Sequence, residues 1–243
     1  MPKVLAALSV FLLLASVLPG SAADRSPRQT QVPPLAELVD QYRRVALSAE
    51  FGGAYRRGRI IKWNGPIVAR LKGANAHRYM REIVSQFTLL AKLTGLRFRV
   101  LGPGAPASTR ANMTITFIDN GGRGPANLER ACGAEVFTDR NLVIRRARIT
   151  INADWRALRR HCIIEEITQA LGLMNDSGYL FPSIFNDNSR QQRLSPWDRM
   201  VIRAHYDRRL RSGMDWSTAE PIVRRNLYNQ LGGATGVGVM LKR

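Results

Sequence analysis

Apolar residues recur every three or four positions in two stretches of the N-terminal half, 35–51 and 77–93. This spacing predicts two amphipathic helices, and a glycine follows each stretch where a helix is expected to stop. Between them, apolar runs at 60–63 and 67–71 flank an Asn-Gly pair, which is typical of a β-hairpin.

The middle of the chain has the pattern of strands and the C-terminal third that of helices. Alternation of apolar and polar residues predicts four strands, at 97–101, 112–118, 134–137 and 142–152. Three helices are expected after them, one from Trp155, one over 194–206 and one over 217–231. Strands grouped between helices predict an α+β fold, a sheet with helices packed on it.

The first residues have the form of a secretory signal peptide. Lys3 precedes an apolar stretch over 4–18, and small residues precede a cleavage site near Ala23. The apolar stretch is short for a membrane span and no second one follows, so the mature chain is expected to have no transmembrane span and to be periplasmic or extracellular. The expected organisation is a signal peptide over 1–23, a flexible leader over 24–34, one domain over 35–231 and a flexible tail over 232–243.

The net charge of +19, from 37 Lys and Arg against 18 Asp and Glu, points to a class of partner. Such an excess is typical of proteins that meet nucleic acid, anionic lipid or an acidic polymer. Export argues against nucleic acid. The arginines are scattered along the chain, which favours a solvated basic surface. Attraction to an anionic component of the cell envelope is the functional alternative.

Cys132 and Cys162 are expected to form a disulfide, because an even cysteine count in an exported protein usually indicates one. The bridge would close a loop of 30 residues and stabilise the protein by roughly 3 kcal/mol. Two buried free thiols are the alternative. A bridge would leave neither sulfur available to a metal ion.

The stretch 165–176 holds the candidate chemistry. Glu165 and Glu166 are adjacent carboxylates in an otherwise apolar helix, and Gln169 shares a helix face with Glu165. Carboxylates are rarely buried in such a helix unless they are paired or bind something.

This stretch resembles the zinc helix of the metzincin peptidases, His-Glu-x-x-His-x-x-Gly-x-x-His, read here as E-E-x-x-Q-x-x-G-x-x-N. The resemblance places Glu166 at the position of the general base and Gly172 at that of the family glycine. Three residues, none of them histidine, fall on the positions of the histidine ligands: Glu165, Gln169 and Asn175. The resemblance implies a zincin-like fold, a mixed β-sheet with packed helices and a central helix of the active-site type.

The resemblance extends over about 97–206. The segment 149–155 stands where the matrixin-like branch has its edge strand and acidic-Trp turn, and 183–185 where it has its turn under the metal, without the methionine. The helix beginning at 194–198 matches the family's Leu-Ser-x-x-Asp pattern. The chain is also similar to an uncharacterised family of exported bacterial proteins, a domain of unknown function with the same E-E-x-x-Q helix.

The donor types at these positions differ from those of a zinc peptidase, which needs three protein ligands, an open position for water and a nearby base. One carboxylate with two neutral amides suits calcium, magnesium or manganese better than zinc. No cofactor is therefore expected, with zinc or another divalent cation as the alternative. A shifted metal site would combine His161 and Glu165 with Asp176 or Asp187; otherwise His161 only donates a hydrogen bond to a carboxylate.

Without a metal, the polar residues of 165–176 would form a buried hydrogen-bond network. Adjacent residues on a helix point apart, so Glu165 and Glu166 are not expected to flank one bond as a glycosidase pair does. Two functions follow. One is a non-catalytic pseudopeptidase, a binding or scaffold module that holds a peptide or an anionic cell-envelope component. The other is a metal-dependent hydrolase with Glu166 as general base. Whether the protein is an enzyme stays open at this point.

Overall fold

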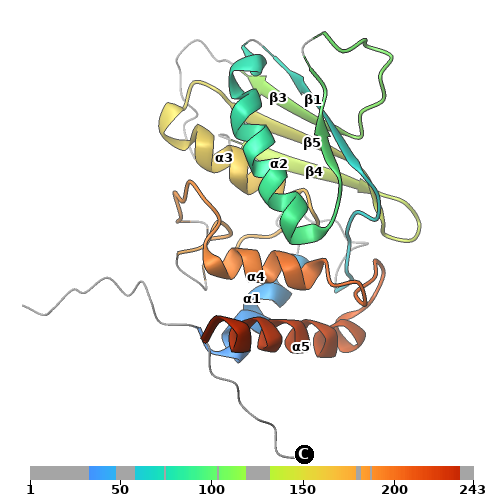
Figure 1. The fold of residues 1–243 in the computed structure, drawn as a ribbon, viewed down its shortest axis with the longest axis vertical. Helices are drawn as coiled ribbons and strands as arrows, with labels where there is room; N and C mark the ends of the chain where they lie inside the picture. The colour runs from blue at the N-terminus through green and yellow to red at the C-terminus, as the bar shows by residue number, and fades with distance from the viewer. Residues whose placement is uncertain are drawn as a thin grey trace, which may run out of the picture. The chain divides into compact units, whose positions relative to one another are not determined.

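The computed structural model describes residues 33–47, 58–73, 75–102, 104–118, 132–178, 182–186 and 188–235. The expected signal peptide, most of the leader, Asp187 and the end of the tail lie outside these ranges. All described residues belong to one compact unit, Val32–Arg243. Its elements, in chain order (Figure 1), are α1 (Leu35–Leu47), β1 (Ile67–Lys72), the 3-10 turn η2 (Ala76–Tyr79), α2 (Met80–Thr94), β2 (Phe98–Val100), β3 (Met113–Ile118), β4 (Cys132–Thr138), β5 (Ile144–Asn152), α3 (Arg156–Gln169), α4 (Pro196–His205) and α5 (Trp216–Thr235).

The strands form one mixed five-stranded sheet in the order β2-β1-β3-β5-β4. The first four run parallel, and β4 pairs antiparallel with β5 at the edge. Helices α2 and α3 lie on the same side of this sheet (Figure 1). The α+β class expected from the sequence is confirmed. None of the helices in the described ranges has the length and apolarity to cross a membrane.

Alternate strand residues point into the core between the sheet and its two helices. The buried ones include Ile67, Ala69, Met113, Ile115, Phe117, Val136, Ala147, Ile149 and Ile151. Burying a Met, Ile or Phe side chain contributes about 1.5–3 kcal/mol, which is why the period of two fixes the register of the strands. The residues between them point to the opposite face, which no helix named above covers in Figure 1.

The hairpin expected around Asn64-Gly65 is wrong. Strand β1 is paired on both sides, by β2 and β3, so no edge of it remains for the run at 60–63. That run bonds elsewhere: Ile60 N donates to Met214 O at 2.8 Å, and Lys62 O accepts from Ile144 N at 3.0 Å. The last helix also differs from expectation, because α5 continues past Leu231 to Thr235.

The C-terminal end of α3 is held by side chains from two distant segments. The final carbonyls of a helix lack partners within the helix. Here Trp63 Nε1 donates to Ala170 O at 2.8 Å, and the Tyr206 hydroxyl donates to Leu171 O at 2.8 Å. Gly172 follows with φ +110°, a conformation that favours glycine. A Cβ at Gly172 would lie 2.1 Å from Ile61 O.

His205 joins the same junction from α4 and is completely buried. Its Nε2 lies 3.0 Å from Ile61 O and its Nδ1 lies 2.9 Å from the Tyr42 hydroxyl. Since a carbonyl only accepts, Nε2 carries the proton and Nδ1 accepts from Tyr42. Burial, with the charge of Lys62 as a second cause, lowers the pKa of His205 to about 3. The residue is therefore neutral and packs inside the protein.

We expect Gly172→Ala to destabilise the protein by about 2–4 kcal/mol, because the new methyl group would collide with the Ile61 carbonyl and the backbone conformation would be strained. Gly65→Ala is the matched control, since a Cβ at Gly65 would meet nothing within 4 Å. Urea unfolding of both variants measures the difference. Equal stabilities would contradict the close approach.

His205 should also make stability depend on pH. Because its folded pKa lies below the usual 6.5, its contribution is complete above about pH 6.5 and is lost as the pH falls towards 3. The free energy of unfolding should fall there by up to about 1.4 kcal/mol per pH unit from this group. His205→Gln keeps a donor for Ile61 O but does not titrate. Denaturant unfolding at several pH values should show that the free energy of unfolding of this variant falls less steeply with pH, by the equivalent of one bound proton. Identical pH dependence in the two proteins would show that His205 is not the titrating group.

Candidate functional site

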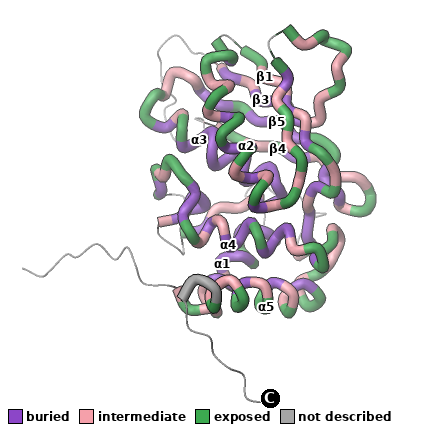
Figure 2. Tube along the Cα trace, in the orientation of Figure 1, coloured by how far each residue is buried: buried purple, intermediate pink, exposed green. Residues whose placement is uncertain are grey.

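The expected site residues gather at the C-terminal half of α3 and the turn after it. We call His161, Glu165, Glu166, Gln169 and Asp176 the acid cluster. Its four residues on α3 are each less than a tenth exposed, at 4%, 8%, 5% and 6% in chain order. Figure 2 shows this half of the helix buried. Such burial of charged groups requires that they be paired inside the protein.

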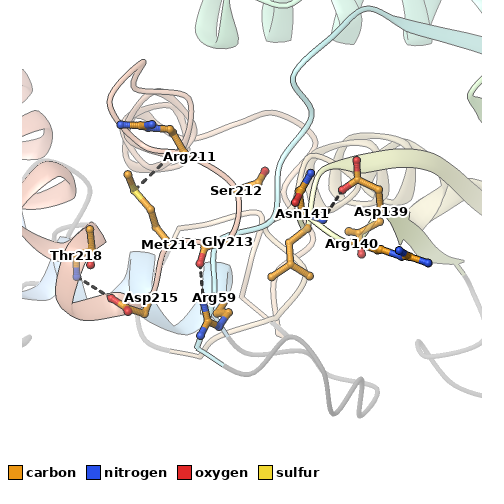
Figure 3. Close-up of a pocket in the computed structure, with 12 residues that line it drawn as sticks. Arg59, Asp139, Arg140, Asn141, Arg211, Ser212, Gly213, Met214, Asp215 and Thr218 are labelled. Carbon is orange, nitrogen blue, oxygen red and sulfur yellow. Dashed lines mark hydrogen bonds between the residues drawn. The ribbon is translucent and has the colours of Figure 1, made fainter.

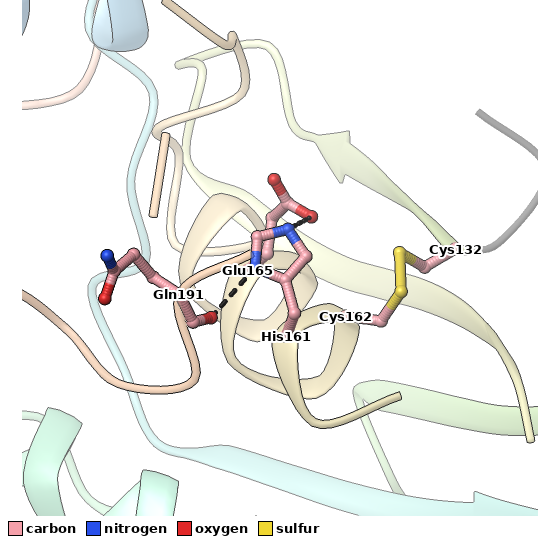
Figure 4. Close-up of a disulfide and its surroundings, with 5 residues drawn as sticks. All are labelled: Cys132, His161, Cys162, Glu165 and Gln191. Carbon is pink, nitrogen blue, oxygen red and sulfur yellow. Dashed lines mark hydrogen bonds and ion pairs between the residues drawn. A yellow bond between two sulfur atoms is a disulfide. The ribbon is translucent and has the colours of Figure 1, made fainter. Parts of the chain in front are cut away.

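His161 is held between a carboxylate and a carbonyl (Figure 4). Its Nε2 lies 3.0 Å from Glu165 Oε2, and its Nδ1 lies 2.9 Å from Gln191 O. Burial alone would lower the pKa of His161, but the hydrogen bond and the charge of Glu165 outweigh it, so the pKa is raised. Protonated, His161 donates to both acceptors and neutralises Glu165.

The two amides at the expected ligand positions turn towards Asp176. Gln169 Nε2 donates to Asp176 Oδ1 at 2.5 Å, and Asn175 Nδ2 donates to the backbone oxygen of Asp176 at 2.8 Å. The charge of Asp176 also reaches His161, whose pKa it helps to raise. The structure thus joins Glu165 to His161 and the amides to Asp176. The importance of Asp176 as a hydrogen-bond acceptor for Gln169 could not be seen in the spacing of the motif.

Glu165 and Glu166 converge beside the disulfide. One oxygen of each lies within 4.8 Å of the other and of Cys132 Sγ. The expectation that these neighbours point apart is wrong, because these oxygens approach each other so closely. Cys132 is bonded to Cys162, so its sulfur is no thiolate and only the carboxylates remain as donors of this group.

The disulfide expected from the sequence is confirmed. It joins Cys132, the first residue of β4, to Cys162 on α3, with a sequence separation of 30 and Cα atoms 5.7 Å apart. Cys162 lies three and four residues before the two glutamates, and this spacing is the sequence signal that the bridge would reach their face of the helix. The bridge fixes the edge strand beside the carboxylates.

A hollow among the described residues lies elsewhere. It measures about 1130 Å³ and lies between the β4–β5 turn and the segment before α5 (Figure 3). Arg140 and Arg211 line it but extend to opposite sides in Figure 3. Asp215 Oδ1 accepts a hydrogen bond from Thr218 N at 2.9 Å. No residue of the acid cluster lines this hollow, and its arginines do not converge on a common ligand position.

These features define a class: a disulfide-bonded α+β protein with a buried acid cluster on the helix that follows its central strands. Residues 35–225 match the family described as "Protein of unknown function (DUF2927)", and the chain belongs to this family. No curated protein matches its sequence. A solved structure described as "Crystal structure of myroilysin" aligns with a TM-score of 0.40 and 14% identity, over 74% of this chain and 99% of that chain. A likeness at this level carries no conclusion about fold or activity.

We expect NMR titration of the imidazoles to find the pKa of His161 above its usual range, and Glu165→Gln to lower it, because the carboxylate supplies the hydrogen bond and the charge. A group with a raised folded pKa stabilises fully below its unfolded pKa, about 6.5 for histidine, and this stability is lost as the pH rises through the folded value. Glu165→Gln should abolish that loss. Glu220→Gln, on α5, is the control and should leave the His161 titration unchanged; a His161 pKa equal in all three proteins would disprove the pair.

Proposed function

We propose that the protein is a non-catalytic binding or scaffold module, a pseudopeptidase of the cell envelope. The observation that carries this proposal is the set of side chains at the three expected ligand positions, Glu165, Gln169 and Asn175. The positions that would ligate zinc in a metzincin are occupied by one carboxylate and two amides, and the amides are hydrogen-bonded to Asp176. Such a hydrogen-bonded set fixes the positions of its side chains and offers one zinc donor, the Glu165 carboxylate, where a catalytic site needs three.

The residues present do not fit a catalytic zinc ion. Zinc sites use histidine, cysteine and carboxylate donors, and a catalytic site needs three of them. Of the three expected positions, Glu165 alone carries such a donor, and it is already bonded to His161. Cys132 lies close but is consumed by its disulfide. We therefore derive no reaction step through zinc.

The zincin-like fold is part of the same proposal. Its support is the order of the elements: a parallel sheet with an antiparallel edge strand, then α3, then a glycine with positive φ that allows the chain to turn sharply. The capping box of α4, in which Ser195 Oγ accepts from Asp198 N at 3.1 Å and Asp198 accepts from Ser195 N at 2.7 Å, stands where the resemblance expects a Leu-Ser-x-x-Asp helix.

Export and the partner are proposed on chemical grounds. The sequence begins like a signal peptide, and disulfides persist in oxidising compartments. With a net charge of +19, the protein would be attracted to anionic components of an envelope. The proposed partner is a peptide or such an anionic component.

A second function is favoured by one observation. The oxygens of Glu165 and Glu166 lie within 4.8 Å of each other, and paired carboxylates suit hard divalent cations. In a metal-dependent hydrolase of this kind, Glu165 would hold the cation and Glu166 would take a proton from the attacking water. This alternative requires that a cation enter a cluster whose carboxylates are nearly closed to solvent.

Metal analysis of the purified mature protein, followed by peptide hydrolysis with and without a chelator, separates the two functions. We expect no stoichiometric zinc, no binding of Zn²⁺, Mn²⁺ or Ca²⁺ by calorimetry, and no chelator-sensitive hydrolysis. Glu166→Gln should then change stability alone, with Glu220→Gln as the matched control. Stoichiometric metal together with hydrolysis that is lost in Glu166→Gln would overturn the proposal and establish the hydrolase.

A further inference from the structure

The face of the sheet opposite α2 and α3 carries a regular set of polar and basic side chains. The strand register aligns them in two rows across the sheet. One row is Arg70, Thr114, Arg148 and Glu135, and the other is Lys72, Thr116, Thr150 and Gly133. Neighbours in a row are about 4.8 Å apart, and successive residues of one strand on this face are about 6.6 Å apart.

This outer face is open to solvent. Lys72, Arg146, Arg148 and Thr150 are exposed, while the residues between them in sequence are buried in the core. The threonines of β3 are half-buried in the middle of the rows. Such a face is unusual for a parallel sheet, which normally has both faces covered.

Two arginines of β5 are held in place by an aromatic ring. The guanidinium carbons of Arg146 and Arg148 lie 4.1 Å and 5.1 Å from the ring centroid of Phe137, on the neighbouring strand β4. Within the described ranges neither arginine forms an ion pair, although Glu135 lies across the ladder from Arg148. Stacking orders the guanidinium groups and leaves their hydrogen-bond donors for another partner.

Arg70 has a different role. Its guanidinium donates to three backbone carbonyls of the segment after β2, at Ala105, Pro106 and Thr109, over 2.8–3.3 Å. It fixes that segment beside the sheet and has little capacity for a ligand. The basic groups available on the outer face are therefore Lys72, Arg146 and Arg148, together with Arg99, which pairs with Val68 at the β2 edge.

We propose that this outer face binds an anionic polysaccharide, with Lys72, Arg146 and Arg148 pairing with its acidic groups and the threonines hydrogen-bonding to its hydroxyls. Arginine forks match carboxylate and phosphate oxygens, and hydroxyls spaced along the rows match a chain rich in hydroxyl groups. A sheet of five strands twists, so its charges do not lie in one plane. A flexible polymer can follow that twist, whereas a flat bilayer surface meets only part of it. The inference is independent of the acid cluster, which lies on the other side of the sheet.

Calorimetry with size-defined oligogalacturonate, a polymer of carboxylates and hydroxyls, tests this surface on the full mature chain. We expect binding that weakens at high salt and is lost when the oligomer is methyl-esterified, since esterification removes its charges. Arg146→Gln with Arg148→Gln should weaken binding by about tenfold or more. Phe137→Leu, which keeps every charge, should weaken it by roughly threefold through the lost stacking.

The control is Arg208→Gln with Arg225→Gln, which removes the same charge from exposed arginines at the α4–α5 end of the protein. It should bind like the wild type. Equal weakening by both double variants would show attraction to net charge alone and overturn the site. Absence of oligogalacturonate binding, or binding only to phosphatidylglycerol vesicles, would also overturn it, the latter in favour of a bilayer. Circular dichroism and thermal unfolding of each variant confirm that it is folded.

Discussion

The C-terminal end of α3 packs against one carbonyl oxygen, that of Ile61. Gly172 passes against it so closely that no side chain fits, and His205 donates a hydrogen bond to it. On either side, Trp63 and Tyr206 bond the last carbonyls of the helix. Because a helix end must satisfy these groups, the direction in which the chain leaves α3 is fixed, and with it the position of Asn175 and Asp176 relative to the acid cluster.

The ionisation states of His205 and Lys62 match the hydrogen bonds that they make around this junction. Burial keeps His205 neutral, so that one nitrogen donates and the other accepts. Lys62, whose pKa burial lowers to about 8, donates to three carbonyls at the end of α4, at His205, Asp207 and Leu210. A cation near the C-terminus of a helix is attracted to the negative end of the helix dipole, which stabilises the structure. In contrast, the hydrogen bond and the charge of Glu165 raise the pKa of His161, so the pKa values of the two buried histidines are shifted in opposite directions.

The sequence predicted most of this architecture and part of the site. Helical spacing and strand alternation located the elements, because burial on one face selects those periods. The cysteine pair and the importance of Gly172 were also visible. The prediction of a hairpin was wrong because an Asn-Gly pair indicates only a local preference for a turn, whereas the pairing of β1 with β2 and β3 depends on distant strands. The convergence of Glu165 and Glu166 depends on side-chain rotamers, which residue spacing does not determine. The rows on the outer face needed the strand register before they could be recognised.

The junction at Ile61 has a consequence for the order of events during synthesis. Its partners are far apart along the chain: 144 residues separate Ile61 from His205, and 163 separate Tyr42 from His205. A ribosome must therefore release nearly the whole domain before this contact can close. Until α4 has been synthesised, the Ile61 carbonyl beside the end of α3 lacks its hydrogen bond from His205, so the last packing step of the domain waits for its C-terminal helices.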